Sequence, residues 1–466
     1  MNSISDNQTN LFNDNQVKSK EPEKPLSLSS IQNQSVLLDF DGGQVSSDAG
    51  LLLLKEAERQ IGIIKALAEV IHDPRDSRYV KHQSIDLMTQ RTFQIAAGYE
   101  DANDCDSLKD DPILKMCANR LPETDGALAS QPTMSRFENS ISRTTLYRFA
   151  KVIIEHFIES YEQEPKLIIL DFDDTADETY GNQQLTLFNK FCNSYCFQPL
   201  HVYEGISGKL ITTILKPGKR CNGKQTLAIF KRIINRLRTE WPNTIIVFRG
   251  DSHFAYPEVM EWIDTQRKVY HVTGLTGYAP LKEQVKAHIQ RAQELYKQKQ
   301  QTVRLYHSFY YQADSWDKHC RVVAKVEMND RGLNLRFVVT DMVQAKASVL
   351  YNDIYCHRGN AELYIKDHKL YLKSDRTSCH RFSANQFRLL LSSAAYVLIH
   401  ALKTNILKTT QWGNATIETI RLKLFKIGAR VRQLKTRIKV ELPTSCPIKE
   451  TLTKSFQIFE VLNYSG

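Results

Sequence analysis

Two apolar segments that each lead into an aspartate constrain the fold of this chain more than any other feature. Residues 167–170 are all apolar and lead into the acidic stretch 171–175, and the nearly apolar residues 244–248 lead shortly afterwards to Asp251. A helical pattern over residues 226–240 lies between the two segments. Runs of this kind are typical of strands buried on both faces of a parallel sheet. Because ligands gather at the carboxyl ends of such strands, the pattern predicts an α/β fold with an acidic site at one sheet edge.

A third carboxylate belongs to the helical pattern of residues 355–369. Separations of three, four and seven residues return to the same face of an α-helix. The pattern therefore places five side chains on one stripe, namely Tyr355, Arg358, Glu362, Lys366 and Lys369. Exposed ion pairs on a solvated helix would give the same stripe. Because Glu362 occurs together with two strand-end aspartates, a site for divalent cations is the better interpretation. Mg²⁺ prefers oxygen ligands, and two such ions stabilise the attacking and leaving oxygens of a phosphodiester.

The charge of the chain favours a polyanionic partner, above all nucleic acid. Its 466 residues include 62 Lys and Arg against 52 Asp and Glu, which gives a net charge of +10 and a pI of about 9.0. Basic residues are concentrated in residues 421–439, which contain no acid. This segment is either a solvated face or a surface that follows DNA phosphates. Alternation with apolar residues favours the second interpretation, with four candidate contacts, Arg430, Arg432, Lys435 and Arg437.

The composition indicates a globular protein of the cytoplasm. With 42% hydrophobic and 24% charged residues, the chain is neither disordered nor fibrous. Its nine cysteines lack zinc-type spacing and indicate reduced thiols. No uninterrupted apolar run approaches the roughly 18–20 residues that cross a bilayer, and the first residues lack the features of a secretory signal. We therefore expect no membrane partner.

The acidic and basic residues together resemble a known family, the DDE transposases of bacterial insertion sequences. The stripe matches the pattern Y-x2-R-x3-E-x6-K of one branch at every position, through Tyr355, Arg358, Glu362 and Lys369. Asp173 stands in a match to the family's D-x-T, and residues 249–254 resemble the branch's R-G-D-S-x-F. Similarity in the N-terminal region extends the resemblance over nearly all of the chain after residue 35.

The resemblance implies an enzyme that binds the terminal inverted repeats of its insertion sequence, cleaves DNA strands and transfers them to target DNA. It further implies a homodimer in the active complex, located at the bacterial nucleoid. Three carboxylates would hold two Mg²⁺ ions, which Mn²⁺ can replace: Asp173, Asp251 and Glu362.

The same resemblance assigns DNA contacts to the rest of the stripe. Arg358 and Lys369 would contact phosphates at the transposon end, and Tyr355 would help to position the scissile strand. Lys366 lies on the same predicted stripe and is a further candidate for DNA binding.

The fold implied by the resemblance is an RNase H-like α/β core, interrupted by a β-rich insertion and preceded by a mainly helical N-terminal domain. The predicted segments are a disordered tail (1–33), a mainly helical DNA-binding region (34–161), two parts of the core (162–268 and 343–404), the insertion between them (269–342) and a basic C-terminal region (405–466).

Two residues outside the predicted site are weaker candidates. Arg136 lies in residues 130–139, which fit either the second helix of a helix-turn-helix or, more simply, an ordinary capped helix. Trp316 lies in the predicted insertion, where it could stack on a flipped base, although a core or surface tryptophan is the simpler interpretation.

Three alternatives are compatible with the sequence. Asp171 lies on the same strand face as Asp173 and is the rival first metal ligand, although the D-x-T match favours Asp173. Residues 171–175 also fit the D-x-D-x-T motif of haloacid dehalogenase-like phosphatases, with Asp171 as nucleophile and Asp173 as acid. That interpretation leaves the stripe and the basic segment without a role. A catalytically inactive DNA-binding protein is the third alternative, against which stand three intact carboxylates.

Overall fold

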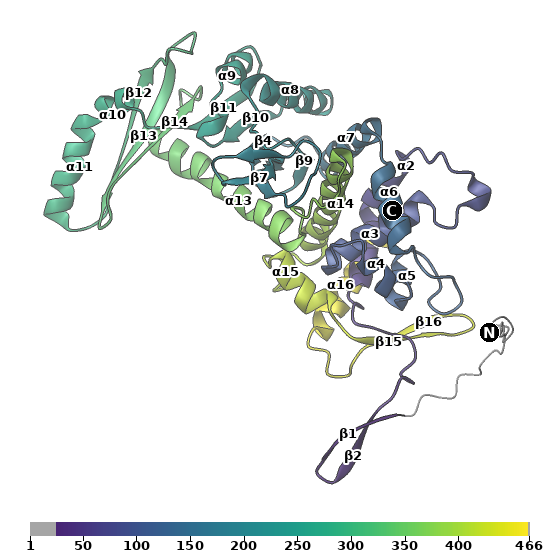
Figure 1. Cartoon of the computed structure of the whole chain (residues 1–466). Coiled ribbons are helices and arrows are strands. Elements are labelled where there is room, and N and C mark those ends of the chain that lie inside the picture. Colours follow the sequence, from purple (N-terminus) through teal and green to yellow (C-terminus); the bar gives the residue numbers. More distant parts are fainter. Residues whose placement is uncertain (1–24, 465–466) are drawn as a thin grey trace, which may run out of the picture.

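An eight-stranded sheet runs through the part of the chain that carries the predicted site (Figure 1). The computed structural model of the protein describes residues 25–464. The strand order of the sheet is β12-β13-β14-β11-β10-β4-β8-β9. In chain order its strands are β4 (Leu167–Asp174), β8 (Leu200–Glu204), β9 (Leu210–Ile214), β10 (Ile245–Gly250), β11 (Val269–Leu275), β12 (Val303–Tyr311), β13 (Cys320–Asn329) and β14 (Gly332–Thr340).

The centre of this sheet is parallel, as the two apolar segments predict. β10 pairs in parallel with both β4 and β11, whereas β8 runs antiparallel to β4, and β9 antiparallel to β8. Phe172 of β4 and Phe248 of β10 pack on Phe230 of α8 (Gly223–Glu240), with ring centroids 5.9 and 4.9 Å apart. α9 (Pro257–Asp264) adds to the same core. The architecture is therefore mixed α/β around a large central sheet.

The predicted insertion continues this sheet instead of leaving it. β14 pairs antiparallel with β11, and β12, β13 and β14 form an antiparallel meander beyond it. Two helices precede the meander, α10 (Ala279–Gln284) and α11 (Lys286–Lys299). The boundary predicted at residue 269 is too early, because β11 (Val269–Leu275) lies next to β10 in the central sheet.

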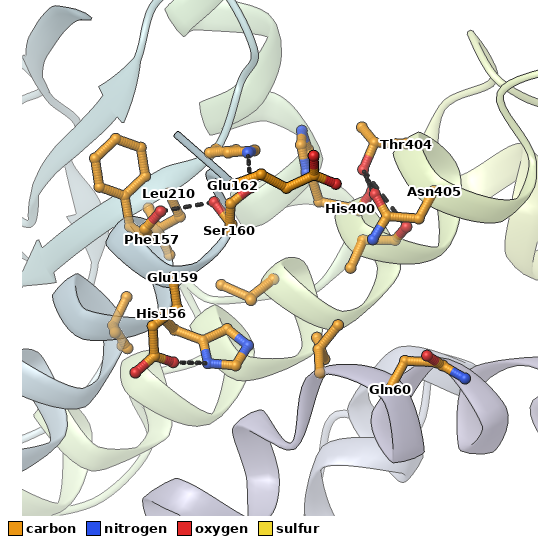
Figure 2. A pocket seen from close by; sticks show the side chains of 15 residues that line it. Gln60, His156, Phe157, Glu159, Ser160, Glu162, Leu210, His400, Thr404 and Asn405 are labelled. Carbon is orange, nitrogen blue, oxygen red and sulfur yellow. Dashed lines mark hydrogen bonds and ion pairs between the residues drawn. The ribbon is translucent and has the colours of Figure 1, made fainter. Parts of the chain in front are cut away.

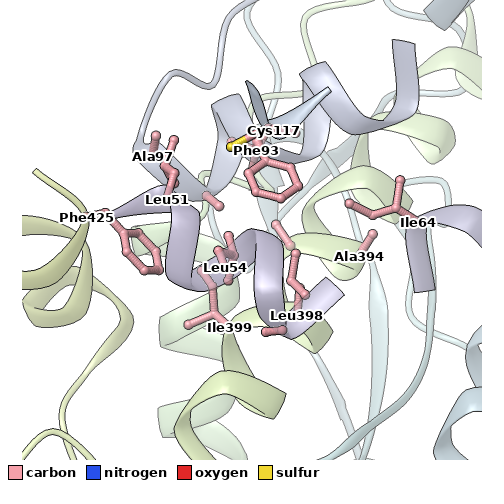
Figure 3. Packing of buried hydrophobic residues seen from close by; sticks show 14 of the residues in the cluster. Leu51, Leu54, Ile64, Phe93, Ala97, Cys117, Ala394, Leu398, Ile399 and Phe425 are labelled. Atoms are coloured by element: carbon pink, nitrogen blue, oxygen red, sulfur yellow. The ribbon is translucent and has the colours of Figure 1, made fainter. Parts of the chain in front are cut away.

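In the described part of the chain, seven α-helices precede the sheet, and a helix from much later in the sequence packs among them. Figure 3 shows Leu51 and Leu54 together with Leu398 and Ile399, which belong to α14 (Phe382–Ala401). Burial of this apolar set forms the largest core. The seven helices are α1 (Leu51–Ile61), α2 (Ile63–Glu69), α3 (Ser84–Ala97), α4 (Asp104–Leu108), α5 (Pro112–Cys117), α6 (Gln131–Ser140) and α7 (Arg143–Glu159).

α14 is also long and apolar enough to cross a membrane by length and composition. Among the described residues one such helix is found, Phe382–Ile406, which includes the continuation of α14. Inside the protein, 67% of its most apolar window is buried. A helix that is apolar around its whole circumference is expected in the core of a large protein, and the packing in Figure 3 agrees with that role.

The C-terminal region packs onto the N-terminal region. β15 (Ala429–Gln433) pairs with β16 (Ile438–Glu441) on one side and with β3 (Val45–Ser46) on the other. The remaining elements are α15 (Ile417–Ile420), α16 (Lys449–Tyr464) and a small sheet of β5 (Asp177–Glu178), β6 (Leu187–Asn189) and β7 (Ser194–Phe197).

The first two strands form a hairpin that projects from the body of the protein (Figure 1). β1 (Leu26–Ile31) and β2 (Gln34–Leu38) pair antiparallel, and the two turn residues have positive φ angles of 48° and 65°, as type I′ hairpin turns require. The prediction of a disordered tail over residues 1–33 is therefore wrong for residues 26–31, which form β1. The many serines of this segment make its strand pattern look like a polar tail. Residues 1–24 of that prediction lie outside the described residues.

Candidate active site

Asp173 and Asp251 lie next to each other at the carboxyl ends of neighbouring parallel strands. Asp173 is the next-to-last residue of β4, and Asp251 directly follows β10. The register pairs Phe172 with Gly250, so the two aspartates occupy the next position on each strand. Asp251 Oδ1 accepts a hydrogen bond from the backbone N–H of His253 at 2.8 Å. This bond holds the carboxylate at the start of the following turn.

The third carboxylate reaches this edge on an irregular helical segment. Its parts are α12 (Ala347–Val349), a π-helical turn (Leu350–Tyr355), a 3₁₀ turn (Cys356–Arg358), α13 (Gly359–Lys366) and a second π-helical turn (Asp367–Tyr371). π-helical turns are rare and occur frequently at functional sites. The predicted helix of residues 355–369 is therefore present but departs from regular α-helical geometry at both ends.

One guanidinium group bridges two of the three carboxylates. Arg358 Nη1 donates to Asp173 Oδ2 at 2.9 Å, and Arg358 Nη2 donates to Glu362 Oε1, also at 2.9 Å. The side chains of Arg358 and Asp173 are 18% and 14% exposed, whereas Glu362 is 63% exposed. A positive group is therefore already held between a carboxylate of the sheet and a carboxylate of the helix.

Burial and neighbouring charges act on the ionisation of Asp173. Desolvation raises the pKa of Asp173 to about 7; Arg358 opposes this shift, and the nearby carboxylate of Asp251 adds to it. Across residues 25–464, no group of three or more His, Cys, Asp or Glu side chains is close enough to form a metal site. The donors nevertheless fit a hard divalent cation, since they supply carboxylate oxygens only and two of them already bind a cationic side chain.

Asp171 is withdrawn from the site by a buried ion pair. Arg249 Nε and Nη2 donate to its two carboxylate oxygens at 2.5 and 2.6 Å, and both side chains are 0% exposed. Arg249 Nη1 also donates to the carbonyl oxygen of Ile354 at 2.5 Å. A Cβ atom at Gly205 would lie 2.4 Å from Arg249, so only glycine leaves room for this pair. In this arrangement Asp171 offers neither a metal ligand nor the nucleophile that a phosphatase needs.

Comparison with known families decides between the alternatives. The sequence model of a family described as Transposase DDE domain group 1 matches residues 28–463. The chain belongs to this family of DDE transposases. It is accordingly an enzyme that cleaves and transfers DNA strands, and the phosphatase interpretation is wrong.

Two other comparisons complete the description of this transposase. A search of curated proteins found no match. Among solved structures, the cryo-EM structure of a piggyBac transposase synaptic complex with hairpin DNA is similar, with a TM-score of 0.43 and 10% sequence identity over 82% of this chain and 80% of that chain.

In the transposase, Lys369 and Lys366 lie in different surroundings. Lys369 Nζ is 3.3 Å from Asp177 Oδ1 and 3.3 Å from Thr175 Oγ1, in the loop that follows β4. Asp177 is 1% exposed, and burial raises its pKa to about 7, opposed by Lys369. Lys366 is exposed and lines a separate pocket near Tyr371. The structure therefore brings Lys369, but not Lys366, to the end of β4.

Tyr355 lies beside the residues that follow β10. A Cβ atom at Gly274 of β11 would lie 2.6 Å from Tyr355 Oη and 2.8 Å from the backbone nitrogen of Ser252. The absence of a side chain at Gly274 therefore lets the phenol pass close to the backbone near Asp251. Burial raises the pKa of Tyr355 above its ordinary value, so its hydroxyl stays protonated and can donate a hydrogen bond at neutral pH.

The four predicted phosphate contacts of the C-terminal region are all exposed. They lie on β15 and on the turn that leads to β16: Arg430, Arg432, Lys435 and Arg437. Glu441 of β16 forms ion pairs with Arg432 and, at 2.8 Å, with Lys439. Two cations at the start of the basic segment have structural partners, since Lys426 Nζ lies 2.7 Å from Asp48 Oδ1 and Arg421 donates to the carbonyl oxygen of Tyr371. The exposed basic surface is therefore the β15–β16 hairpin.

The two weaker candidates differ in their exposure. Arg136 is exposed on α6, where its guanidinium donates to Thr133 Oγ1 at 3.2 Å. Trp316 is 7% exposed and packs edge-on against Tyr311, with ring centroids 5.8 Å apart. The indole therefore belongs to the core between α11 and the β12–β14 meander and offers no free face to a base.

A pocket of about 400 Å³ lies away from these residues (Figure 2). It is lined by the end of α7, the start of β9 and the end of α14, and it includes His156 and His400. Burial lowers the pKa of each of these histidines to about 4, so both are neutral at physiological pH. Lys209 Nζ donates to the Ser160 carbonyl at 2.9 Å. The pocket contains none of the predicted site residues.

Proposed function

We propose that this transposase binds the terminal inverted repeats of a bacterial insertion sequence and cleaves and transfers strands at the ends of β4 and β10. The observation that supports this most directly is the Arg358 bridge. Arg358 binds Glu362 of its own helical segment and Asp173 of the sheet, which lies 185 positions before Arg358 in the chain. We further propose that β9, β8, β4, β10 and β11 are the RNase H-like core, in which the parallel strands β4, β10 and β11 adjoin the antiparallel strands β8 and β9.

The direct test is a cleavage assay on the DNA that brackets the gene. We expect purified transposase with Mg²⁺ to nick a labelled duplex at the end of a flanking inverted repeat, and to leave a scrambled duplex of equal length uncut. Equal nicking of both duplexes, or of neither, would contradict the proposal.

In this proposal, two divalent cations are held by Asp173, Asp251 and Glu362. When bound, such ions stabilise the attacking and leaving oxygens of a phosphodiester. Arg358 is placed to exchange its carboxylate partners for a DNA phosphate, which its planar guanidinium can bind in bidentate fashion. The Tyr355 hydroxyl can donate to the scissile strand, and Asp177 holds Lys369 at the end of β4 until a phosphate arrives.

Removing the Arg358 guanidinium is expected to strengthen metal binding in the absence of DNA. Arg358→Gln frees Asp173 and Glu362 from a competing cation, and the affinity for Mn²⁺ should rise about tenfold, as expected for the loss of a unit charge a few ångströms away. Isothermal titration of the DNA-free protein measures this directly.

Arg220→Gln is the matched control for Arg358→Gln. It removes the same charge from Asp174, where Arg220 Nε lies 3.4 Å from Oδ1, but it frees none of the three proposed ligands. A much smaller gain in affinity is therefore expected. Equal gains for the two variants would reduce the Arg358 effect to general electrostatics, and an unchanged affinity in Arg358→Gln would place the metal ions elsewhere.

Neutralising the basic hairpin is expected to weaken DNA binding for all sequences alike. Phosphates carry no base information, so replacing Arg430, Arg432, Lys435 and Arg437 by glutamine should affect terminal-repeat and scrambled duplexes equally. The slope of log K against log salt should fall by up to about 3.6, at roughly 0.9 per phosphate contact. Fluorescence anisotropy at several salt concentrations gives the slope.

Glu441→Gln supplies a control of opposite sign. It releases Arg432 and Lys439 from their acidic partner, so general DNA affinity should rise while the fold is unchanged. A slope identical to wild type in the quadruple variant would remove the hairpin from the DNA surface.

The partners proposed for the complete reaction are two DNA ends and a target duplex. A homodimer would hold the two terminal repeats together, each in one active site. The setting proposed for this reaction is the nucleoid in the bacterial cytoplasm.

A further inference from the structure

The N-terminal hairpin exposes an apolar face to solvent. Leu26 pairs with Leu38 and Leu28 with Val36, so these four side chains share one face of the two strands. Leu26, Leu28 and Leu38 are 53%, 54% and 47% exposed. An isolated two-stranded hairpin is marginally stable in water, and it needs a further surface to bury its apolar side. We therefore expect the apolar face of the hairpin to pack against a further protein surface.

The charge of the hairpin argues against DNA as that surface. Residues 25–41 include Asp39 and Asp41 but no Lys or Arg. A segment with this charge is repelled by phosphates, which attract cationic side chains. The complementary surface is instead an apolar groove with basic residues at its rim.

A groove of this kind lies between α7 and α8. Its volume is about 310 Å³, and its apolar residues include Ile154 of α7, Ile214 of β9 and Ile229 of α8. Lys151 and Arg232 line the same groove, both are exposed, and within residues 25–464 neither forms an ion pair. Glu155 and Arg236 also line the groove but pair with each other. The groove therefore matches the hairpin in both respects, with isoleucines for its leucines and two unpaired bases for its two acids.

In this structure the hairpin lies far from the groove of its own chain. Figure 1 shows the hairpin at one end of the molecule and α7 and α8 at the other. The base of the hairpin is fixed by β3, where Val45 pairs with Arg430 of β15. The six residues 39–44 that connect β2 to β3 span at most about 20 Å when fully extended. With so short a connection to a fixed base, a groove on another copy is the candidate receiver of the hairpin.

We propose that the N-terminal hairpin of one copy docks its apolar face into the α7–α8 groove of a second copy. Reciprocal docking of two hairpins gives a closed, twofold symmetric assembly. The inference concerns assembly of the free protein and is independent of strand cleavage, so its test uses neither DNA nor metal ions.

Sedimentation equilibrium of the full chain tests the docking face. Leu28→Asp places a charge on the apolar face and should weaken self-association at least about tenfold, as buried anchor residues of interfaces do. Leu37→Asp is the matched control, because Leu37 is 62% exposed and pairs with Ser27 on the opposite face. It should associate like wild type. A monomeric wild-type protein at tens of micromolar, or equal effects of the two variants, would overturn the proposal.

Charge reversal and photo-cross-linking test the groove. Asp39→Lys with Asp41→Lys should weaken association, and Lys151→Glu with Arg232→Glu should restore it when the reversed chains are mixed. A photoreactive benzoylphenylalanine at position 28 of an unlabelled chain, mixed with a ¹⁵N-labelled chain, should give labelled cross-links in α7 or α8. Labelled cross-links elsewhere, cross-links confined to the unlabelled chain, or no rescue by the reversed charges would each overturn the docking site.

Discussion

Asp173→Asn, Asp251→Asn and Glu362→Gln will each abolish strand cleavage while terminal-repeat DNA is still bound. The amide keeps the shape of each side chain but removes the charge that holds a divalent cation. Such a cation supplies several kcal/mol of transition-state stabilisation, so cleavage should fall at least about a thousandfold. Product formation from a labelled terminal-repeat duplex in Mg²⁺ measures the loss, and a gel-shift assay with the same duplex measures binding.

Asp174→Asn is the control for these three variants. Asp174 adjoins Asp173 in β4, but its Oδ1 accepts a hydrogen bond from Gln198 at 3.1 Å and lies 3.4 Å from Arg220 Nε, away from Arg358. Its replacement should leave cleavage within a few-fold of wild type. Any of the three predicted ligands that tolerates the amide equally well would be wrongly assigned.

Local sequence patterns predicted the elements that carry this site. The apolar runs that became β4 and β10 are central strands because a parallel sheet covered on both faces requires apolar residues at every position. Because neighbouring parallel strands end at the same edge of the sheet, the prediction of these two strands was enough to place Asp173 next to Asp251. The i,i+4 spacing of Arg358 and Glu362 likewise predicted their contact, since about one helical turn, from the end of the 3₁₀ turn into α13, separates them.

Contacts between distant segments could not be predicted in this way. β11 (Val269–Leu275) joins the central sheet, and β3 pairs with β15, through partners that no local periodicity identifies. The second π-helical turn, which carries Lys369, likewise has no sequence signal in the residues themselves. The hairpin of β1 and β2 was not predicted, because its alternation of leucine and serine lies next to a polar segment.

The pairing of Asp171 with Arg249 was also missed, although its signal was present. Each residue stands two positions before a strand-end aspartate, and side chains two apart on a strand point to the same face. Once β4 and β10 are parallel neighbours, their register sets Asp171 opposite Arg249. This pair separates the two aspartates of the D-x-D motif: Asp171 becomes a structural residue, and Asp173 stays at the site, where it binds Arg358.

Asp171→Asn will strongly destabilise the protein. Without Asp171, the Arg249 guanidinium is left buried with no counter-ion. Breaking a buried pair from one side reduces the free energy of unfolding by about 3–5 kcal/mol. Denaturant unfolding monitored by circular dichroism measures the loss.

Glu155→Ala is the matched control, because Arg236 binds Glu155 with the same two guanidinium nitrogens, but at 31% and 38% exposure. Its effect should stay below about 1 kcal/mol. Comparable losses in the two variants would contradict a special role for burial.

Replacing both partners separates stability from alignment of the active site. Asp171→Leu with Arg249→Met removes the buried charges together and should recover much of the lost stability, as apolar replacements of buried ion pairs do. It also removes the hydrogen bond from Arg249 to the carbonyl of Ile354, which ties both strands to the helical segment just before Tyr355. Cleavage should therefore stay impaired in a protein that unfolds near the wild-type midpoint. Recovery of both properties would show that the pair serves the fold alone.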